Sequence, residues 1–369
     1  MADVEIGIGK AARRAYSLDE ITIVPSRRTR DSADVDISWQ LEAFSMPLPL
    51  MAAPADSVVS PLAAFEIGRL GGIAVLDLEG LWTRHEDPEG WLEQIAAAPE
   101  EELTSVVREA YSAPVKSELV ARRVSELSEG CTVACGSVSP KRAAELAPAA
   151  VAAGLDVLVI RASVVSAEHV RKSGEALDMN GFIRSIDLPV VIGGCASHQT
   201  ALHLMRAGAA GVLVGGGEIS TTRGVLGVGV PQATALADAA GARTRHLEET
   251  GAYVHVIADG GLSSGGDVAK AFACGADAVM LGAPLAAAAE APGGGTYFDR
   301  GAAHDRLPES RRVPAPCKGS LEEILLGPGR EGDGRLNLFG ALRASMATSG
   351  YATIREFHKA EVVVSSPNP

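Results

Sequence analysis

Basic residues and aromatic residues are both scarce in this 369-residue chain. Lys and Arg number 33 against 46 Asp and Glu, which gives a formal net charge of −13, and aromatic residues make up 4% of the sequence. A general nucleic-acid-binding protein carries a basic surface, so the composition argues against that class. An anionic ligand would need a locally built site, made of backbone N–H groups and a few cations. The 41 glycines and the 47% hydrophobic content indicate a globular core packed from small and aliphatic residues.

Long apolar runs and paired cysteine motifs are also missing. No run of 18 apolar residues occurs, and the first 14 residues contain no apolar signal-peptide core. We therefore expect a cytoplasmic protein without a membrane span. The five cysteines form an odd, scattered set, which favours reduced thiols over a disulfide framework. Cys131 and Cys135 have no matching second pair, so we expect no metal site.

Several catalytic signatures are absent as well. Gly7-Ile8-Gly9 resembles the start of a dinucleotide-binding fingerprint, but it follows no predicted strand and has Ala12 where the third glycine is needed. The eight histidines form no H-E-x-x-H pattern, and no G-x-S-x-G elbow occurs. The chemistry must therefore be sought at the ends of the predicted strands.

Eight short apolar runs recur along the chain, and each ends in Gly or small polar residues. Near-continuous apolar runs are expected for strands that are buried on both faces of a parallel sheet. Helical patterns rich in Ala, Leu, Glu and Arg lie between them, and several end in a glycine that favours a left-handed helix stop. The predicted strands are 48–53, 72–76, 131–135, 156–160, 189–193, 211–215, 255–259 and 277–281.

Eight such units predict an α/β fold, a (β/α)8 TIM barrel formed by one domain over residues 1–369. The alternative is an open doubly wound sheet, which usually has fewer strands and a reversal of strand order that the sequence does not show. We expect extra helices in 78–130. The segment at about 293–335, after strand eight, is rich in Gly, Pro and charge and is either disordered or a mobile flap. The apolar helical pattern of 336–347 would anchor its far end, which favours the flap.

Residues suited to bind anions follow the last three predicted strands. The loop 215–224 begins with three glycines and continues with hydroxyl residues and Arg223. It is either an anion cradle beside a nucleophile or proton relay, or a flexible surface turn. Asp259 ends strand seven, where it is either an acceptor for a ribose diol or a turn aspartate. The loops after strands seven and eight often build a phosphate site in barrels, with a helix N-terminus aimed at the anion.

Five motifs in this order resemble the IMP dehydrogenase/GMP reductase family over nearly the whole chain. The resemblance extends to the actinobacterial IMP dehydrogenase-related branch that lacks CBS modules, because 78–130 is too short to hold the usual CBS pair. It implies a TIM barrel, a homotetramer, a purine nucleotide substrate of the IMP, XMP and GMP class, and the cofactor NAD. The motifs are Tyr16–Pro25, Ala52–Val58, Ile192–Gly194, the strand-six loop through Arg223, and Ala258–Gly261 with Met280–Gly282.

The resemblance also implies a reaction, the oxidation of IMP with NAD⁺ and water to XMP and NADH in guanine nucleotide biosynthesis. In the family a cysteine of the strand-six loop attacks C2 of the purine, and Ser220 stands at that position here. A serine needs a stronger base than a cysteine, because a thiol ionises near neutral pH and an alcohol does not. Thr222 is the general-base candidate by position. Backbone carbonyls of this loop are a candidate K⁺ site.

The remaining site residues follow from the same resemblance. Cys195 and Arg161 are expected beside the nicotinamide cofactor, and Asp333 is expected at the purine edge. The predicted nucleotide-binding residues are Gly215, Gly217, Asp259, Gly260, Gly261, Gly282, Gly319 and Asp333.

Other positions depart from the family pattern. Glu218 and Ala283 replace small or hydroxyl residues at the phosphate, Ala55 replaces a methionine that packs on the base, and Arg330 has no adjacent tyrosine. Three functions therefore stay open: a purine-nucleotide oxidoreductase with an altered active site, a catalytically impaired nucleotide-binding paralogue that acts as a regulator, and a GMP reductase-like or modified-purine reductase.

Overall fold

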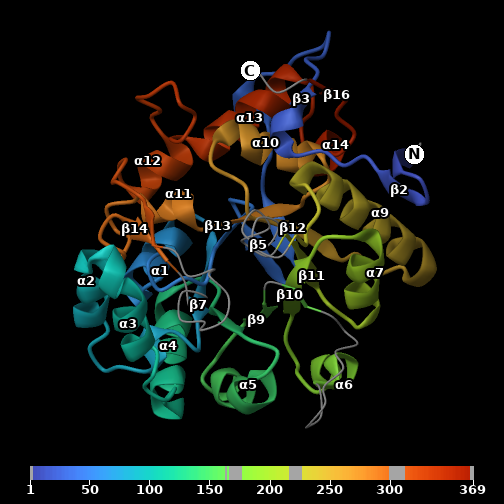
Figure 1. Ribbon diagram of the computed structural model, residues 1–369. Coiled ribbons are helices and arrows are strands. Elements are labelled where there is room, and N and C mark those ends of the chain that lie inside the picture. The colour runs from blue at the N-terminus through green and yellow to red at the C-terminus, as the bar shows by residue number, and fades with distance from the viewer. Residues whose placement is uncertain (1–2, 163, 166–176, 216–226, 299–311, 366–369) are drawn as a thin grey trace.

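Eight parallel strands close into a barrel, which confirms the predicted fold class (Figure 1). The computed structural model describes residues 3–162, 164–165, 177–215, 227–298 and 312–365. Around the barrel the strands follow chain order, and the last strand pairs with the first. The barrel strands are β6 (Leu50–Ala52), β7 (Ile73–Asp77), β8 (Cys135–Val138), β9 (Val157–Arg161), β10 (Val190–Cys195), β11 (Gly211–Val214), β12 (His255–Asp259) and β13 (Ala278–Leu281).

Alternate side chains along the strands divide between two apolar layers. Met51 and Val159 belong to an inner cluster that fills the barrel, whereas Leu50 and Leu158 belong to the layer beneath the helices. The hairpin of β4 (Trp39–Leu41) and β5 (Phe44–Met46) adds its apolar side chains to the inner cluster. The indole N–H of Trp39 donates to Nδ1 of His255, the first residue of β12, so this hairpin closes the N-terminal end of the barrel.

Helices surround the barrel on its outer side (Figure 1). Ser60, Ser197 and Ser264 cap three of them, each through a side-chain oxygen that accepts a backbone N–H of the first turn. The glycines predicted to stop three helices have positive φ angles of +96° to +107°. The helices that follow the strands include α1 (Pro61–Arg69), α4 (Ser117–Gly130), α5 (Ala143–Ala152), α6 (Met179–Arg184), α7 (His198–Arg206), α9 (Gln232–Thr250), α10 (Gly265–Ala273) and α13 (Leu338–Thr348).

The third predicted strand is misplaced by four residues. It was expected at 131–135, but β8 begins at Cys135, and Cys131 is the C-cap residue of α4 instead. Val133 is buried in the inner cluster and Ala134 donates its N–H to the Asp156 carboxylate, so this approach segment is apolar without being a strand. An apolar run marks burial and does not by itself mark where a strand begins.

Both long segments contain regular secondary structure. The expected extra helices of 78–130 are present as α2 (Glu89–Ala97), α3 (Glu100–Ala110) and α4. Within 293–335 lie the short strands β14 (Thr296–Tyr297) and β15 (Val313–Pro314) and the helix α12 (Leu321–Leu326). Leu321, Ile324 and Leu325 of this helix are buried. The predicted flap is therefore folded over much of its described length, and 299–311 lie outside the described residues.

The last strand of the chain lies beside α13, whereas the N-terminal hairpin lies beside α9 (Figure 1). Strand β16 (Val362–Val364) pairs antiparallel with β3 (Ile21–Ile23), and both lie near α13 in Figure 1. The hairpin of β1 (Asp3–Gly7) and β2 (Lys10–Arg13) lies against α9, where the Arg13 guanidinium pairs with Asp238. In the described parts of the chain, no helix is long and apolar enough to cross a membrane.

Candidate active site

An ion pair at the open end of the barrel joins two predicted site residues. Arg161 ends β9 and Asp259 ends β12, and Nε of the arginine lies 3.2 Å from Oδ2 of the aspartate. The Asp259 side chain is 3% exposed and that of Arg161 is 16% exposed. Asp259 was predicted to bind the nucleotide and Arg161 the cofactor, so the structure brings the two proposed subsites into direct contact.

The end of β11 passes very close to this pair. A Cβ atom placed on Gly215 would lie 2.0 Å from the carbonyl oxygen of Asp259, and the φ angle of Gly215 is +125°. No other residue fits there without moving β11 away from β12. Gly260 and Gly261 follow Asp259 with φ angles of +101° and +71°. Two successive positive φ angles require glycine, so the backbone can turn sharply directly after Asp259.

Gly282, at the end of β13, is covered by a residue that the sequence analysis missed. A Cβ on Gly282 would lie 2.9 Å from the ring of Tyr297 and 3.0 Å from its hydroxyl oxygen. Tyr297 belongs to β14, inside the segment that was expected to be a flap. No local sequence signal marks this tyrosine, because its role depends on where β14 folds back over the barrel.

Buried carboxylates after β6 and β7 were also missed. Asp77, the last residue of β7, accepts the N–H of Glu79, and the Glu79 carboxylate accepts the N–H of Ser139 at 2.5 Å. Asp56 accepts the Tyr111 hydroxyl at 2.5 Å and the Leu81 N–H at 3.0 Å. The sequence could have identified Asp77 as a candidate site residue, because it directly follows the predicted strand at 72–76.

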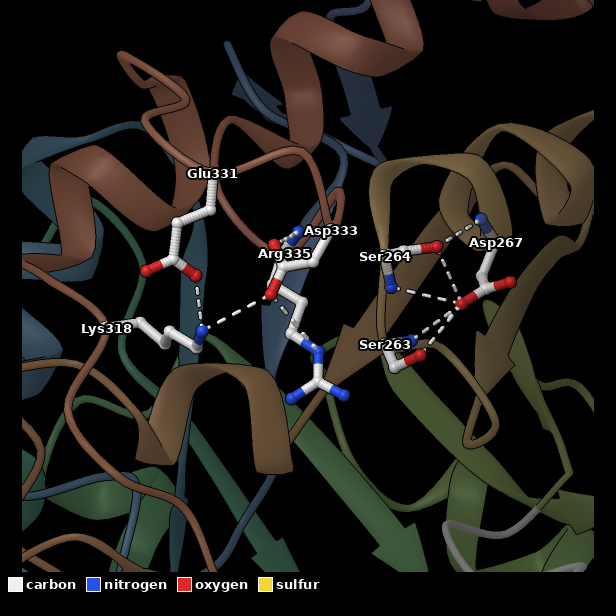
Figure 2. Close-up of polar contacts among 7 residues, drawn as sticks. All are labelled: Ser263, Ser264, Asp267, Lys318, Glu331, Asp333 and Arg335. Carbon is white, nitrogen blue, oxygen red and sulfur yellow. Dashed lines mark hydrogen bonds and ion pairs between the residues drawn. The ribbon is translucent and has the colours of Figure 1, made fainter.

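Asp333 lies in a cluster of charges on the segment that precedes α13 (Figure 2). Lys318 Nζ lies 2.5 Å from the Glu331 carboxylate and 3.3 Å from that of Asp333, which also accepts the Arg335 N–H at 3.0 Å. That backbone hydrogen bond is the main cause of the lowered pKa of Asp333, with Lys318 adding to it. Gly319 follows Lys318, and its carbonyl accepts the N–H of Ala289.

Asp267, in the first turn of α10, accepts hydrogen bonds from the residues just before the helix. Asp267 Oδ2 accepts four hydrogen bonds, two from the backbone and two from the hydroxyls of Ser263 and Ser264 (Figure 2). The N–H of Gly265 donates to the carbonyl of Gly334 at 2.8 Å. The helix N-terminus that was expected to face a phosphate is therefore largely satisfied by protein groups.

The Cys195 thiol is buried away from water. It is 3% exposed and packs in the outer apolar layer, and burial raises its pKa to about 12. Burial likewise raises the pKa of Cys131 and Cys274 to about 11. These thiols are not activated nucleophiles at neutral pH. Cys195 ends β10 at the mouth, but its side chain lies beneath the helices.

The predicted catalytic loop lies outside the described residues. Ser220, Thr222 and Gly217 fall within 216–226, as does Glu218, so their roles stay predictions. Within the described residues, no group of three or more His, Cys, Asp or Glu side chains is arranged to hold a metal ion.

These features define a class of protein. A (β/α)8 barrel that is plugged at its N-terminal end and carries a buried ion pair and glycine turns at its C-terminal end has the arrangement of barrel enzymes, whose active sites lie at that end.

The particular family follows from comparison with known proteins. Residues 15–306 match the model of the IMP dehydrogenase / GMP reductase domain, and the chain belongs to that family. It is 49% identical to an uncharacterized oxidoreductase of Mycolicibacterium smegmatis, over 98% of this chain and all of that protein. It is 37% identical to the inosine-5′-monophosphate dehydrogenase of Haemophilus influenzae, over 64% of this chain and half of that enzyme.

A solved structure agrees with the sequence relatives. The crystal structure of an IMP dehydrogenase/GMP reductase-like protein from Corynebacterium glutamicum superposes with a TM-score of 0.93 at 44% identity and covers 98% of both chains. The protein is therefore an oxidoreductase of the IMP dehydrogenase/GMP reductase family.

Proposed function

We propose that this protein oxidises a purine nucleotide: IMP, NAD⁺ and water give XMP, NADH and a proton, in guanine nucleotide biosynthesis. Family membership over residues 15–306 is the observation that carries the proposal. The barrel mouth supports it, because a buried aspartate and turned glycine amides are suited to bind a ribose and an anion.

Asp259 is our candidate for the ribose of the nucleotide. Its carboxylate ends a barrel strand, is 3% exposed and lies 3.2 Å from Nε of Arg161. An ionised carboxylate can accept both hydroxyls of a ribose diol. Gly260 and Gly261 would offer N–H groups from the same loop.

Arg161 is our candidate for the cofactor side. NAD⁺, when bound, supplies the hydride acceptor. Arg161 fits a position beside it, because its guanidinium reaches the mouth and is partly exposed. Cys195 fits less well, because its thiol packs beneath the helices with a raised pKa.

Ser220 and Thr222 are the proposed nucleophile and general base. The raised pKa values of Cys195, Cys131 and Cys274, which burial causes, support a search for the nucleophile outside these three thiols. A serine at position 220 needs its proton removed before it can attack C2, which makes a nearby base more important than in an enzyme with a cysteine.

A second function is a nucleotide-binding paralogue that regulates without turnover. The serine at position 220 and the Asp259–Arg161 contact, which engages the proposed ribose acceptor, favour it. A GMP reductase-like reaction, or reduction of a modified purine, would use the same mouth in the opposite redox direction.

The deciding experiment follows NADH absorbance with IMP and NAD⁺, beside thermal unfolding with IMP, XMP and GMP. We expect NADH formation that depends on IMP and falls at least about a hundredfold in Ser220→Ala. Turnover unchanged in Ser220→Ala would overturn the role of Ser220. A nucleotide-dependent thermal shift without NADH would favour the regulator, and NADPH-dependent reduction of GMP would favour the reductase.

We also propose a homotetramer and a K⁺ site formed by carbonyls of the strand-six loop. Light scattering after size-exclusion chromatography tests the first. Replacement of KCl by LiCl at constant ionic strength tests the second, since a K⁺-dependent enzyme would lose turnover in lithium.

A further inference from the structure

A cavity of about 640 Å³ lies at the N-terminal end of the barrel, opposite the candidate active site. Its walls are the segments just before β9, β10, β11 and β12, together with the turn between β4 and β5. None of the described residues of the candidate active site lines it. Small-molecule sites commonly have volumes of about 300–1,000 Å³, so this cavity is large enough for a ligand of its own.

The charged side chains that line this cavity are acidic. Glu42, Asp156 and Asp187 contribute carboxylates, and no lysine or arginine of the described residues lines it. Asp156 uses one oxygen to accept the N–H of Ala134, whereas Glu42 and Asp187 are exposed at the rim. A hollow lined by one sign of charge concentrates potential of that sign, so the cavity favours a cation and disfavours an anion.

Apolar side chains form much of the remaining wall, and this argues for an organic cation. Leu155, Val190, Met205 and Val254 all line the cavity and are at most 5% exposed. A metal ion would need several oxygen or nitrogen ligands at one point. No such group of three or more His, Cys, Asp or Glu side chains occurs in the part of the chain that the structure describes. The wall therefore fits a ligand with an apolar body and a positive headgroup.

A buried histidine of α9 lacks a hydrogen-bond partner in this cavity wall. His246 lines the cavity and is 5% exposed, and its Nδ1 has no partner among the described residues. Leaving a buried polar atom without a partner costs about 1–3 kcal/mol, which a ligand could recover. The torsion about Cβ–Cγ of histidine is broad, so a small rotation of the ring brings Nδ1 to a ligand in the cavity.

The protonation state of His246 decides what this ligand must offer. Burial is the main cause of its lowered pKa; Glu249 opposes the decrease and Arg206 adds to it. The ring is therefore neutral at neutral pH, and a neutral imidazole has one nitrogen that accepts a hydrogen bond. An ammonium group supplies the donor, whereas a carboxylate ligand would meet the negative potential of the rim.

We propose that this cavity binds an organic ammonium ion with an apolar body. The apolar part packs against the buried wall, and the ammonium group donates to Nδ1 of His246 in the field of the Glu42 and Asp187 carboxylates. An ammonium has three N–H donors, so a carboxylate or water can take the others. The site is separate from the candidate active site, and its occupation does not depend on a nucleotide.

Three ligands of the same shape test the charge preference. Phenethylamine, 2-phenylethanol and phenylacetate share a phenyl body and differ in a positive, neutral or negative headgroup. In isothermal titration of the full chain at neutral pH, we expect phenethylamine to bind at least about tenfold more tightly than 2-phenylethanol, and phenylacetate to bind least. Equal affinities for the three, or no phenethylamine binding up to about 10 mM, would overturn the proposal.

Three substitutions place the binding in this cavity. His246→Leu removes the acceptor and weakens phenethylamine binding at least about tenfold, and it costs little stability because Nδ1 has no protein partner to lose. Glu42→Gln lowers the rim potential and weakens binding severalfold. Ala252→Trp puts a bulky side chain at an exposed position of the cavity wall and abolishes binding. Glu5→Gln, an exposed glutamate of the N-terminal hairpin, is the matched control and leaves the affinity unchanged.

Circular dichroism verifies that each variant is folded before titration. Normal phenethylamine affinity in a folded Ala252→Trp shows that the amine binds elsewhere and overturns the proposal. Normal affinity in a folded His246→Leu removes the hydrogen bond on which the ligand class depends and overturns it as well. If His246→Leu does not fold, Ala252→Trp and Glu42→Gln decide, because both change exposed residues. An equal loss in Glu42→Gln and Glu5→Gln would reduce the charge effect to the net charge of the chain and contradict a local site.

Discussion

Charged side chains at the two ends of the barrel differ in how fully protein groups satisfy their hydrogen bonds. At the N-terminal end, Asp277 accepts hydrogen bonds from Arg243 at 2.6 Å, from the Tyr253 hydroxyl at 2.6 Å and from the Val256 N–H at 2.8 Å. At the C-terminal end, Lys318 and Arg335 keep donors without a protein acceptor in the described residues. A charge satisfied by its neighbours stabilises the fold, whereas a charge with donors to spare is available to a ligand.

Breaking the N-terminal network gives the largest expected effect on stability. Asp277→Ala leaves Arg243, whose side chain is 9% exposed, as a buried charge without its carboxylate. Removing one partner of a buried pair costs about 3–5 kcal/mol. Urea denaturation followed by circular dichroism measures the free energy of unfolding. A loss below about 1 kcal/mol would contradict a structural role for the network.

The equivalent change at the open end separates binding from stability. Asp259→Asn keeps the shape but removes the charge that faces Arg161. Losing a hydrogen bond to a charged group costs about 1.5–3 kcal/mol, so we expect IMP affinity to fall about tenfold to a hundredfold. Unfolding free energy should change less than in Asp277→Ala, because Arg161 is partly exposed.

Titration of IMP into Asp259→Asn, beside the control Asp187→Asn on the exposed rim of the other end, tests this difference. The distinction between the two ends fails if Asp259→Asn is as unstable as Asp277→Ala and still binds IMP normally.

Histidines at the N-terminal end predict a pH dependence of stability. Burial is the main cause of the lowered pKa of His255 and His358. His255 accepts the Trp39 N–H and His358 lies 2.8 Å from the Ala276 carbonyl; Asp277 and Glu42 raise the pKa of His255, and Arg243 and Arg355 lower it. Both histidines thus stay neutral in the fold at a pH where the unfolded chain takes up protons.

The direction of this pH dependence follows from the linkage between proton binding and folding. The unfolded chain binds more protons below its histidine pKa of 6.5, so the free energy of unfolding decreases as pH falls from 6.5 toward the lower folded pKa values. Denaturation at pH 7.5, 6.5 and 5.5 should show this decrease, and His358→Gln should flatten it. If the unfolding free energy of His358→Gln changes with pH as steeply as that of the wild type, His358 does not contribute to the pH dependence.

The sequence predicts the fold well because strand patterning is local. Most barrel strands contain a short apolar run, such as Val157–Ile160 in β9 and Val256–Ala258 in β12, and the chain order of the strands is also their order around the barrel. The strand at 131–135 was wrong because Val133 is buried without being in a strand, and burial produces the same pattern. Glycines at helix ends were predicted correctly because a positive φ angle is a property of single residues.

The site is less predictable because its contacts join distant residues. Arg161 and Asp259 are 98 positions apart, and each was predicted for a different ligand. Tyr297 reaches Gly282 only because β14 folds back, and the pairing of Lys318 with Glu331 depends on how α12 packs between them. Side-chain chemistry can be read from a motif, but partners are set by tertiary structure.

An exposed ion pair between α7 and α9 gives the smallest expected effect, and it tests whether burial or position in the fold makes an ion pair structural. Arg206 lies 2.6 Å from Glu249, near the end of α9, and both side chains are about one-third to one-half exposed. Solvent screens such pairs, so Arg206→Gln should change the unfolding free energy by less than about 1 kcal/mol. Added salt should remove most of that small difference and leave the loss in Asp277→Ala nearly unchanged. If Arg206→Gln destabilises as much as Asp277→Ala, then burial is not what makes the Asp277 network structural.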